Sequence, residues 1–292
     1  MKILALDSSG LVASVALMED ENLIAEYTVQ YKKTHSQTLL PMLEEIARMV
    51  ELDLSTVDAI AVAAGPGSFT GLRIGSATAK GLAFALNKPI VPVPTVDGLA
   101  YQMYGTEALV CPIMDARRSQ VYTGIYEFVP TQTGQYKYEK KDYETALRTC
   151  CAERTRAMPP AACVHQVLVP GFSKNFCVWE NMRHKYDMNV IKEQCAVSFD
   201  EIAAELNKMG RKVLFLGDGV PVFRERMTET LQVPYSIAPA HRARQSAAAV
   251  AALGGLYYAQ GKVEGGAEHT PVYLRLSQAE REQAEKERGK TL

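Results

Sequence analysis

The sequence predicts a duplicated α/β fold in which two halves each follow the element order βββαβαβα, with a cleft between them. Three observations support this prediction. Short apolar runs of strand length alternate with longer amphipathic runs at helical spacing. A Gly-Pro-Gly turn at 65–67 separates one apolar run from a long apolar helix. The same order of elements then begins again near residue 108.

The first half is expected to span residues 1–105 and to open with three strands. They cover Lys2–Leu6, Leu11–Leu17 and Leu23–Tyr31, because each run is rich in strand-forming residues and is bounded by polar or turn residues. A first helix follows these strands. The later elements of this half are a strand at 58–64, a central helix from Ser68 to Leu86, a strand at 89–93 and a short helix at about 95–104.

The first helix is amphipathic, because Leu39, Leu43 and Ile46 share one of its faces. We expect Thr38 to cap it. Pro41 would then lie in the first turn, where no backbone N–H is needed. A start before Thr38 would place the proline inside the helix and would kink it.

The central helix is apolar on nearly every side, which is typical of a helix covered on more than one side. Leu72, Gly75 and Ala79 are expected to pack on the chain's own sheet. Phenylalanine and arginine together on the opposite face are typical of interface cores. The alternative is that the first helix or the second half covers this face. The predicted partner interface consists of Phe69, Arg73, Ile74, Ala77, Lys80, Gly81 and Phe84, together with His35 and Leu39.

The loop before the central helix has the spacing Gly65-x-Gly67-x-x-x-Gly71, one residue longer than the dinucleotide fingerprint. The Gly-Lys-Ser/Thr ending of a P-loop is missing, because Leu72 and Arg73 follow the last glycine. Phosphate binding at this helix N-terminus remains an alternative. We interpret the glycines as turn and packing residues.

The second half is expected at 106–245, with an insertion at about 131–195, and the C-terminal helix and tail at 246–292. Ser198 and Glu201 form a capping box that opens a helix ending before Gly210. Ser246 is expected to cap an Ala-rich helix. The other predicted elements are strands at 108–114, 120–128, 135–139, 212–216 and 233–237, helices at 222–231 and 278–288, and an extended piece at 271–275.

The insertion contains five of the six cysteines together with His165 and His184. These side chains are candidate zinc ligands, but the sequence contains no Cys-x-x-Cys pair, so free thiols are favoured. The five cysteines are Cys150, Cys151, Cys163, Cys177 and Cys195.

Composition describes an ordinary globular chain of 292 residues that is 47% hydrophobic and 22% charged. The net charge of −1 argues against a broad basic surface, so any contact with nucleic acid by this chain alone would be local. No signal peptide or membrane-spanning segment is recognised, and we expect a cytoplasmic location without membrane attachment.

Five motifs together resemble the TsaB family, also called YeaZ. The resemblance covers roughly residues 1–128 and 196–280, and the Gly65–Gly75 motif is highly specific. The motifs are Ile3–Ser9, His35–Pro41, Gly65–Gly75 followed by Ala79–Ala83, Asp115–Arg118, and Pro271–Arg275.

The resemblance implies the actin-like, sugar-kinase-like (ASKHA) ATPase fold. It also implies a role in attaching a threonylcarbamoyl group to N6 of the adenosine beside the anticodon of certain tRNAs. TsaB is a non-catalytic partner subunit in that machinery, TsaD is its catalytic paralogue, and TsaE is an accessory ATPase. We therefore expect contact with tRNA only through the complex, a homodimer through the same surface, and no cofactor or metal of its own, since ATP and metal belong to the partner subunits.

The resemblance also implies a vestigial nucleotide site. Asp7 and Ser8 match a first phosphate turn, and Gly217 and Gly219 match an adenosine loop. At the second phosphate turn the sequence has Asp115–Arg118, in which two arginines would crowd a phosphate.

The catalytic paralogue carries a His-x-x-x-His metal pair at a place where this sequence has Thr95 and Leu99. Neither is a usable ligand for a transition metal. The alternatives kept open are an ATP-dependent small-molecule kinase and a metallopeptidase of the same fold. Asp115–Arg118 argues against the kinase, and the missing histidines argue against the metallopeptidase.

Overall fold

The computed structural model describes residues 1–31, 34–131 and 186–275. The chain divides into two compact units, of which the first comprises Met1–Val129 and Met188–Leu292, and the second comprises Pro130–Asp187. The elements described below belong to the first unit, apart from the adjoining ends of two strands.

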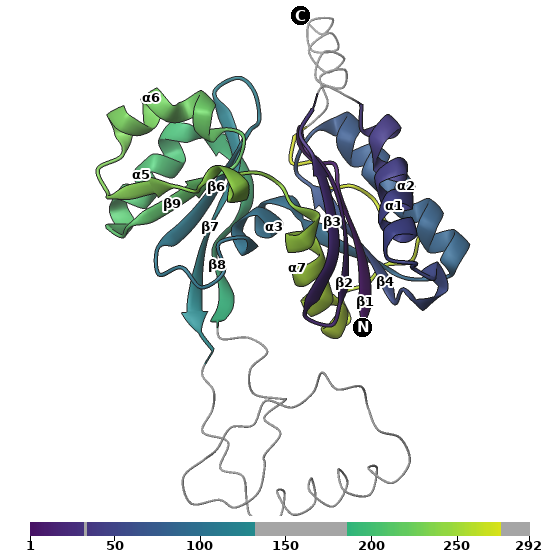
Figure 1. Ribbon diagram of the computed structural model, residues 1–292. Coiled ribbons are helices and arrows are strands. Elements are labelled where there is room, and N and C mark those ends of the chain that lie inside the picture. The colour runs from purple at the N-terminus through teal and green to yellow at the C-terminus, as the bar shows by residue number, and fades with distance from the viewer. Residues whose placement is uncertain (32–33, 132–185, 276–292) are drawn as a thin grey trace, which may run out of the picture. The chain divides into compact units, whose positions relative to one another are not determined.

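The first sheet has the strand order β3-β2-β1-β4-β5 (Figure 1). β1 pairs antiparallel with β2 and parallel with β4, and β4 is parallel to β5. The predicted strands are confirmed, with ends that differ by no more than two residues. The strands are β1 Lys2–Asp7, β2 Ala13–Glu19, β3 Asn22–Val29, β4 Ala59–Gly65 and β5 Ile90–Pro94.

Both faces of this sheet are covered. Leu4 and Leu6 of β1 lie in a core shared with α1 and α2, whereas Ile3 and Ala5 lie in a core shared with α7. A strand buried on both faces reads as a continuous apolar run, as β1 does. The helices around this sheet are α1 His35–Met49, α2 Phe69–Leu86, α3 Thr95–Tyr101 and α7 Ala247–Ala259, with short 3₁₀ turns at Leu54–Thr56 and Ala240–Arg242.

The prediction that α1 begins at Thr38 is wrong. The helix begins at His35 after Thr34, and the Thr38 hydroxyl lies within its first turn, 3.4 Å from the carbonyl oxygen of Thr34. Pro41 therefore lies inside the helix. Pro41 is on the exposed side of α1, so the Gln37 carbonyl that it leaves without an N–H partner is open to water.

α2 begins as the sequence predicts. The Ser68 hydroxyl accepts a hydrogen bond from the Gly71 backbone N–H at 3.3 Å, and Asn87 ends the helix in a left-handed conformation. Leu72, Gly75 and Ala79 are buried against the first sheet, as expected. Among the described residues, no helix is long and apolar enough to cross a membrane.

Ser246 precedes α7 but does not cap it with its side chain. Its hydroxyl instead donates to Glu26 Oε1 at 2.7 Å. The first two N–H groups of the helix are held from the first sheet, because Ala247 donates to Ser14 Oγ at 2.9 Å and Ala248 donates to Glu26 Oε1 at 3.2 Å. Side chains from β2 and β3 thus replace the predicted local cap.

The second sheet has the order β10-β9-β6-β7-β8, which repeats the first sheet strand for strand with β6 in the place of β1. The prediction of a duplicated α/β fold is confirmed, because both halves have the same strand order. The elements of this half are β6 Leu109–Asp115, β7 Gln120–Pro130, β8 Tyr186–Ser198, α5 Phe199–Met209, β9 Val213–Leu216, α6 Val220–Thr230 and β10 Tyr235–Ile237.

β8 covers residues that were expected to belong to the insertion. The predicted end of the insertion at about residue 195 is therefore wrong. β8 lies at the edge of the sheet and is only partly buried, which leaves polar residues along it and hides the strand pattern. The strand expected at 135–139 and the helix expected at 278–288 lie outside the described residues.

Candidate functional site

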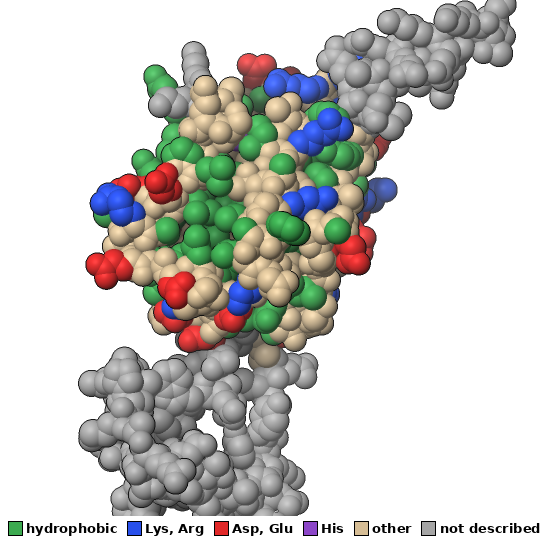
Figure 2. Space-filling model, turned by 90° about the vertical axis from the view of Figure 1, so that its right-hand side faces the viewer, with side chains coloured by type: hydrophobic (Ala, Val, Ile, Leu, Met, Phe, Trp, Pro, Cys, Tyr) green, Lys and Arg blue, Asp and Glu red, His purple; other side chains and the backbone are tan. Residues whose placement is uncertain are grey.

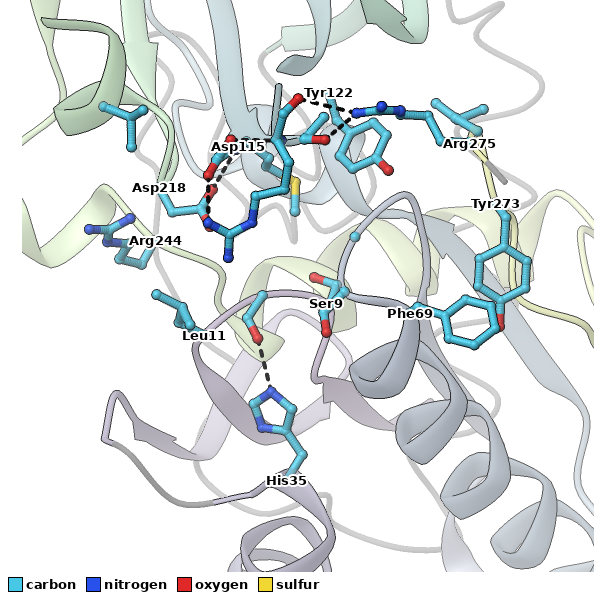
Figure 3. A pocket seen from close by; sticks show the side chains of 18 of the residues that line it. Ser9, Leu11, His35, Phe69, Asp115, Tyr122, Asp218, Arg244, Tyr273 and Arg275 are labelled. Atoms are coloured by element: carbon cyan, nitrogen blue, oxygen red, sulfur yellow. Dashed lines mark hydrogen bonds and ion pairs between the residues drawn. The ribbon is translucent and has the colours of Figure 1, made fainter. Parts of the chain in front are cut away.

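A pocket of about 670 Å³ lies at the carboxyl ends of the central strands of both sheets (Figure 3). Ligand sites of open α/β sheets occur at this edge, where strand ends meet helix N-termini. Its walls come from the loop after β1, the start of α2, the turn after β6, the start of α6 and the segment 273–275. The lining includes Ser9, Gly10, Leu11, His35, Ser68, Phe69, Asp115, Arg117, Asp218, Arg244, Tyr273 and Arg275.

The loop after β1 turns two of the predicted site residues away from this pocket. Asp7 is buried, and its Oδ1 accepts hydrogen bonds from the backbone N–H and the hydroxyl of Ser9, at 2.9 and 2.7 Å. Burial raises the pKa of the Asp7 carboxyl to about 6. Ser8 is also buried and donates to the Gly71 carbonyl at 2.9 Å. Ser9 and Gly10 therefore line the pocket in place of Asp7 and Ser8.

The glycines of the loop before α2 permit close backbone contact with the loop after β1. A Cβ atom at Gly67 would fall 2.2 Å from the Ser9 carbonyl oxygen, and one at Gly71 would fall 2.1 Å from that of Ser8. Any side chain there would force the two loops apart. The interpretation of these glycines as packing residues is confirmed.

Gly217 and Gly219, expected in an adenosine loop, have their backbone donors engaged. The Gly217 N–H donates to the Ala243 carbonyl and the Gly219 N–H to the Ile113 carbonyl, both at 2.9 Å. Asp218 between them lines the pocket instead.

The turn after β6 has an unusual backbone. Arg117, Arg118 and Ser119 have φ values of 64°, 54° and 57°, so three consecutive non-glycine residues adopt the left-handed conformation. The Arg275 guanidinium donates to the Ala116 and Arg117 carbonyl oxygens (Figure 3), the second at 3.2 Å. A residue distant in the sequence therefore holds this strained turn.

Two carboxylates line this side of the pocket. Asp115 pairs with the Arg117 guanidinium at 3.2 Å. Asp218 accepts a hydrogen bond from the Asp115 backbone N–H at 3.2 Å, and burial raises the pKa of its carboxyl. Two carboxylates in one wall of a pocket are unfavourable for a polyphosphate unless a cation accompanies it. Asp218 and Arg275 were not predicted, because the chain brings them together from segments far apart in the sequence.

Thr95 and Leu99, at the place of the paralogue's metal pair, are buried. The Thr95 hydroxyl accepts a hydrogen bond from the Gly65 backbone N–H at 3.1 Å, so it supports the loop before α2. Within the described ranges, no group of three His, Cys, Asp or Glu side chains could hold a metal ion. Cys195 and Cys111 are free thiols, and the other four cysteines lie outside the described residues.

The outer face of α2 is a separate candidate site. Phe84 is 90% exposed, and Ala77 and Gly81 are exposed beside it. Leu40 and Met49 of α1 are exposed as well. Figure 2, a view onto the side of α1 and α2, shows hydrophobic side chains gathered on this face.

The N-terminal end of this face is tied to the pocket. Arg73 is exposed, and its guanidinium lies 3.9 Å from the centre of the Phe69 ring, which itself contacts the ring of Tyr273 at 5.0 Å between centroids. Ile74 and Lys80 are partly buried. Phe69 and Tyr273 also line the pocket, so the two sites share one wall.

Two residues expected in the interface lie elsewhere. Leu39 is only 1% exposed and belongs to the core beneath α1, so it is not available to a partner. Leu39 shares the buried face of α1 with Leu43 and Ile46, as the helical spacing predicted, so its inclusion in the interface is wrong. His35 lines the pocket, and its Nε2 lies 2.9 Å from the Gly10 carbonyl oxygen. Within the described chain, nothing covers Phe84, so the alternative of an internal cover over this part of α2 is wrong.

Known proteins resemble this chain over different extents. The family model described as TsaD, tRNA N6-adenosine threonylcarbamoyltransferase, matches residues 22–283. The tRNA threonylcarbamoyladenosine biosynthesis protein TsaB of Bacillus subtilis is 41% identical over 128 residues, which are 44% of this chain and 56% of that protein. The TsaB of Escherichia coli is 35% identical over 130 residues, which are 44% of this chain and 55% of that protein. The chain thus spans little more than half the length of these relatives.

Among solved structures, YeaZ from Pseudomonas aeruginosa superimposes with a TM-score of 0.64 at 25% identity, over 94% of this chain and 99% of that chain. The similarity in fold therefore extends beyond the segment in which sequence identity is high. The family model covers most of the chain as well. The chain belongs to the TsaD-type family of tRNA N6-adenosine threonylcarbamoyltransferase proteins, and within it to the TsaB, or YeaZ, group.

Proposed function

We propose that this chain takes part in forming threonylcarbamoyladenosine in tRNA, as a subunit that binds and stabilises a TsaD-type catalytic partner. The observation that carries the proposal is the exposed apolar face of α2, in a chain whose relatives are named TsaB. A contiguous exposed apolar face on a folded protein is typical of an interaction site.

The small residues of α2 support a helical partner at this face. Gly81 lies in the middle of the helix, where glycine costs about 0.5–1 kcal/mol relative to alanine. A Cβ atom at Gly81 would meet nothing within 4 Å, so the chain's own packing does not require this glycine. Together with Ala77, it leaves a shallow surface on which another helix can approach closely. Phe84 next to this surface would supply a buried anchor.

The pocket supports a role without catalysis by this chain alone. Asp7 and Ser8 are engaged in internal hydrogen bonds, and Asp115 and Asp218 line the place where phosphates would lie. Thr95 supports a loop instead of binding a metal. The chemistry would then belong to the partner, with TsaE as an accessory ATPase and with tRNA bound through the complex.

The proposal is tested by Ala77→Glu, which places a charge in the centre of the proposed contact. Ala204→Glu is the matched control, because Ala204 is an exposed alanine on α5 of the other half. We expect Ala77→Glu to abolish co-purification with the TsaD-type protein of the same cells, and Ala204→Glu to leave it intact. Both variants should melt within a few degrees of the wild type, since exposed substitutions change stability by about 0.5 kcal/mol or less. Normal complex formation by Ala77→Glu would refute the proposed surface.

The same face is self-complementary in principle, because a two-fold axis brings one patch onto its copy. We therefore also propose that the chain pairs with itself when the partner is absent. Ala77→Glu should then make the purified chain monomeric in sedimentation equilibrium, whereas Ala204→Glu should leave the dimer unchanged.

A further inference from the structure

A second cavity, of about 560 Å³, lies beside the segment that leads into α7. β3 contributes Glu26, Thr28 and Gln30 to its wall, the end of α3 contributes Tyr101 and Gln102, and the remaining lining residues come mainly from 240–249. None of the predicted site residues lines this cavity. It shares Arg244 with the first pocket but no residue with the outer face of α2, so a ligand in this cavity is independent of the proposed partner contact.

The cavity contains polar groups that the described chain leaves without partners. Gln245 is only 3% exposed, yet neither its Nε2 nor its Oε1 has a hydrogen-bond partner among the described residues. The same holds for Nη1 of the neighbouring Arg244. A buried amide and a buried guanidinium nitrogen without partners are costly and rare in a folded protein. Their presence together points to a molecule that supplies the missing hydrogen bonds.

Both side chains belong to an anchored segment. The Gln102 amide donates to the Arg244 carbonyl at 2.7 Å, and the Arg242 guanidinium donates to the Gln102 carbonyl at 3.1 Å. The Gln245 amide packs against the loop after β1, where a Cβ atom at Gly10 would lie 2.5 Å from its Nε2. The backbone of the segment is therefore held from two sides.

The charges of the cavity favour an anion. His241, Arg242 and Arg244 come from one short stretch of the lining. The carboxylate of Glu26 faces them, but its Oε1 already accepts hydrogen bonds from Ser246 Oγ and the Ala248 N–H at the start of α7. Its negative charge is thus compensated by the N-terminus of that helix. Arg244 also lines the first pocket, where its charge partly offsets the effect of burial on the pKa of the Asp218 carboxyl. His241 and Arg242 are exposed, and a guanidinium fits the geometry of a phosphate well.

We propose that this cavity binds a phosphate group, with Arg244 and Gln245 donating to its oxygens and with His241 and Arg242 at the exposed rim. The phosphate group could come from a small phosphorylated molecule or from the backbone of an RNA. Calorimetry and thermal melting of the full chain with inorganic phosphate, a nucleoside monophosphate and a short single-stranded RNA, at constant ionic strength, distinguish these sources.

Arg244→Gln should weaken binding about tenfold or more, as expected for the loss of one charge-assisted hydrogen bond. Arg211→Gln is the charge-matched control, because Arg211 pairs with Glu127 and does not line the cavity. Its affinity should equal that of the wild type. The melting temperature should rise with the bound probe in the wild type and the control, and by much less in Arg244→Gln.

Gln245→Met provides the second test if Arg244→Gln fails to fold. An apolar side chain of similar size removes the unpaired amide, so the ligand-free protein should melt at the same or a higher temperature. The rise in melting temperature with the probe should be smaller than in the wild type. The proposal is overturned if no probe binds the wild type more tightly than chloride does, or if Arg244→Gln and Gln245→Met both retain full affinity.

Discussion

Replacing Phe84 by alanine tests the function of α2 through a single side chain. Phe84 is 90% exposed, so its removal should leave the free energy of unfolding within about 0.5 kcal/mol of the wild-type value. In a complex the ring would become buried, and burial of a phenylalanine contributes about 1.5–3 kcal/mol. At 1.4 kcal/mol for each factor of ten, the Kd for the TsaD-type partner should rise about 10- to 100-fold.

The assay combines isothermal titration calorimetry with thermal melting of the same protein preparation. Val222→Ala is the matched control, because Val222 is an exposed apolar residue on α6, and its binding should be unchanged. The proposed contact is refuted if Phe84→Ala binds the partner with wild-type affinity. It is equally refuted if the variant melts far below the wild type, because Phe84 would then belong to the chain's own core.

Three further substitutions test the site and the fold. Asp7→Asn should raise the melting temperature at pH 7, because the raised pKa of Asp7 means that the neutral carboxyl favours folding and the charged one opposes it. The stability of the wild type should fall as the pH rises from about 4 to about 6 and then level off. Thermal melting across this pH range should show that fall in the wild type and not in Asp7→Asn. Arg275→Met should increase hydrogen exchange in the turn after β6, because the Arg275 guanidinium no longer donates hydrogen bonds to the carbonyl oxygens of Ala116 and Arg117. Ser198→Ala should cost about 1 kcal/mol in urea unfolding, because the Ser198 hydroxyl caps α5.

Local patterns were enough to predict most elements. Ser68 and Ser198 mark helix starts correctly, because in each case the hydroxyl bonds a backbone N–H three residues later. The predicted start of α1 is wrong, because Pro41 lies on the exposed side of the helix, where it is tolerated beyond the first turn. The cap of α7 could not be predicted either, since Glu26 reaches it from a strand far away in the sequence.

The pocket was predicted less well than the fold. Motifs led to Asp7 and Ser8, but burial turns both away from the pocket, and only the neighbouring Ser9 and Gly10 line it. Asp218 also lines the pocket, whereas the motif indicated only the backbone of Gly217 and Gly219 on either side of it. Side-chain direction at such a site depends on contacts between loops, and a single sequence does not specify those contacts.

The outer face of α2 was predicted better than the pocket but less completely than the fold. Helical periodicity correctly separated buried Leu72 from exposed Ala77, because one helix determines both directions. Periodicity alone could not tell whether another part of the chain covers the second face. The 90% exposure of Phe84 shows that none of the described residues covers that part of the face.

The central claim is that this chain is required for the tRNA modification but does not catalyse it. The most direct measurement is threonylcarbamoyladenosine formed in tRNA by purified components: this chain, the TsaD-type partner and TsaE, together and with each omitted. We predict product with all three, no product from this chain alone, and no product when Ala77→Glu replaces the wild type. Product formed by this chain alone, or undiminished product when it is omitted, would contradict the account.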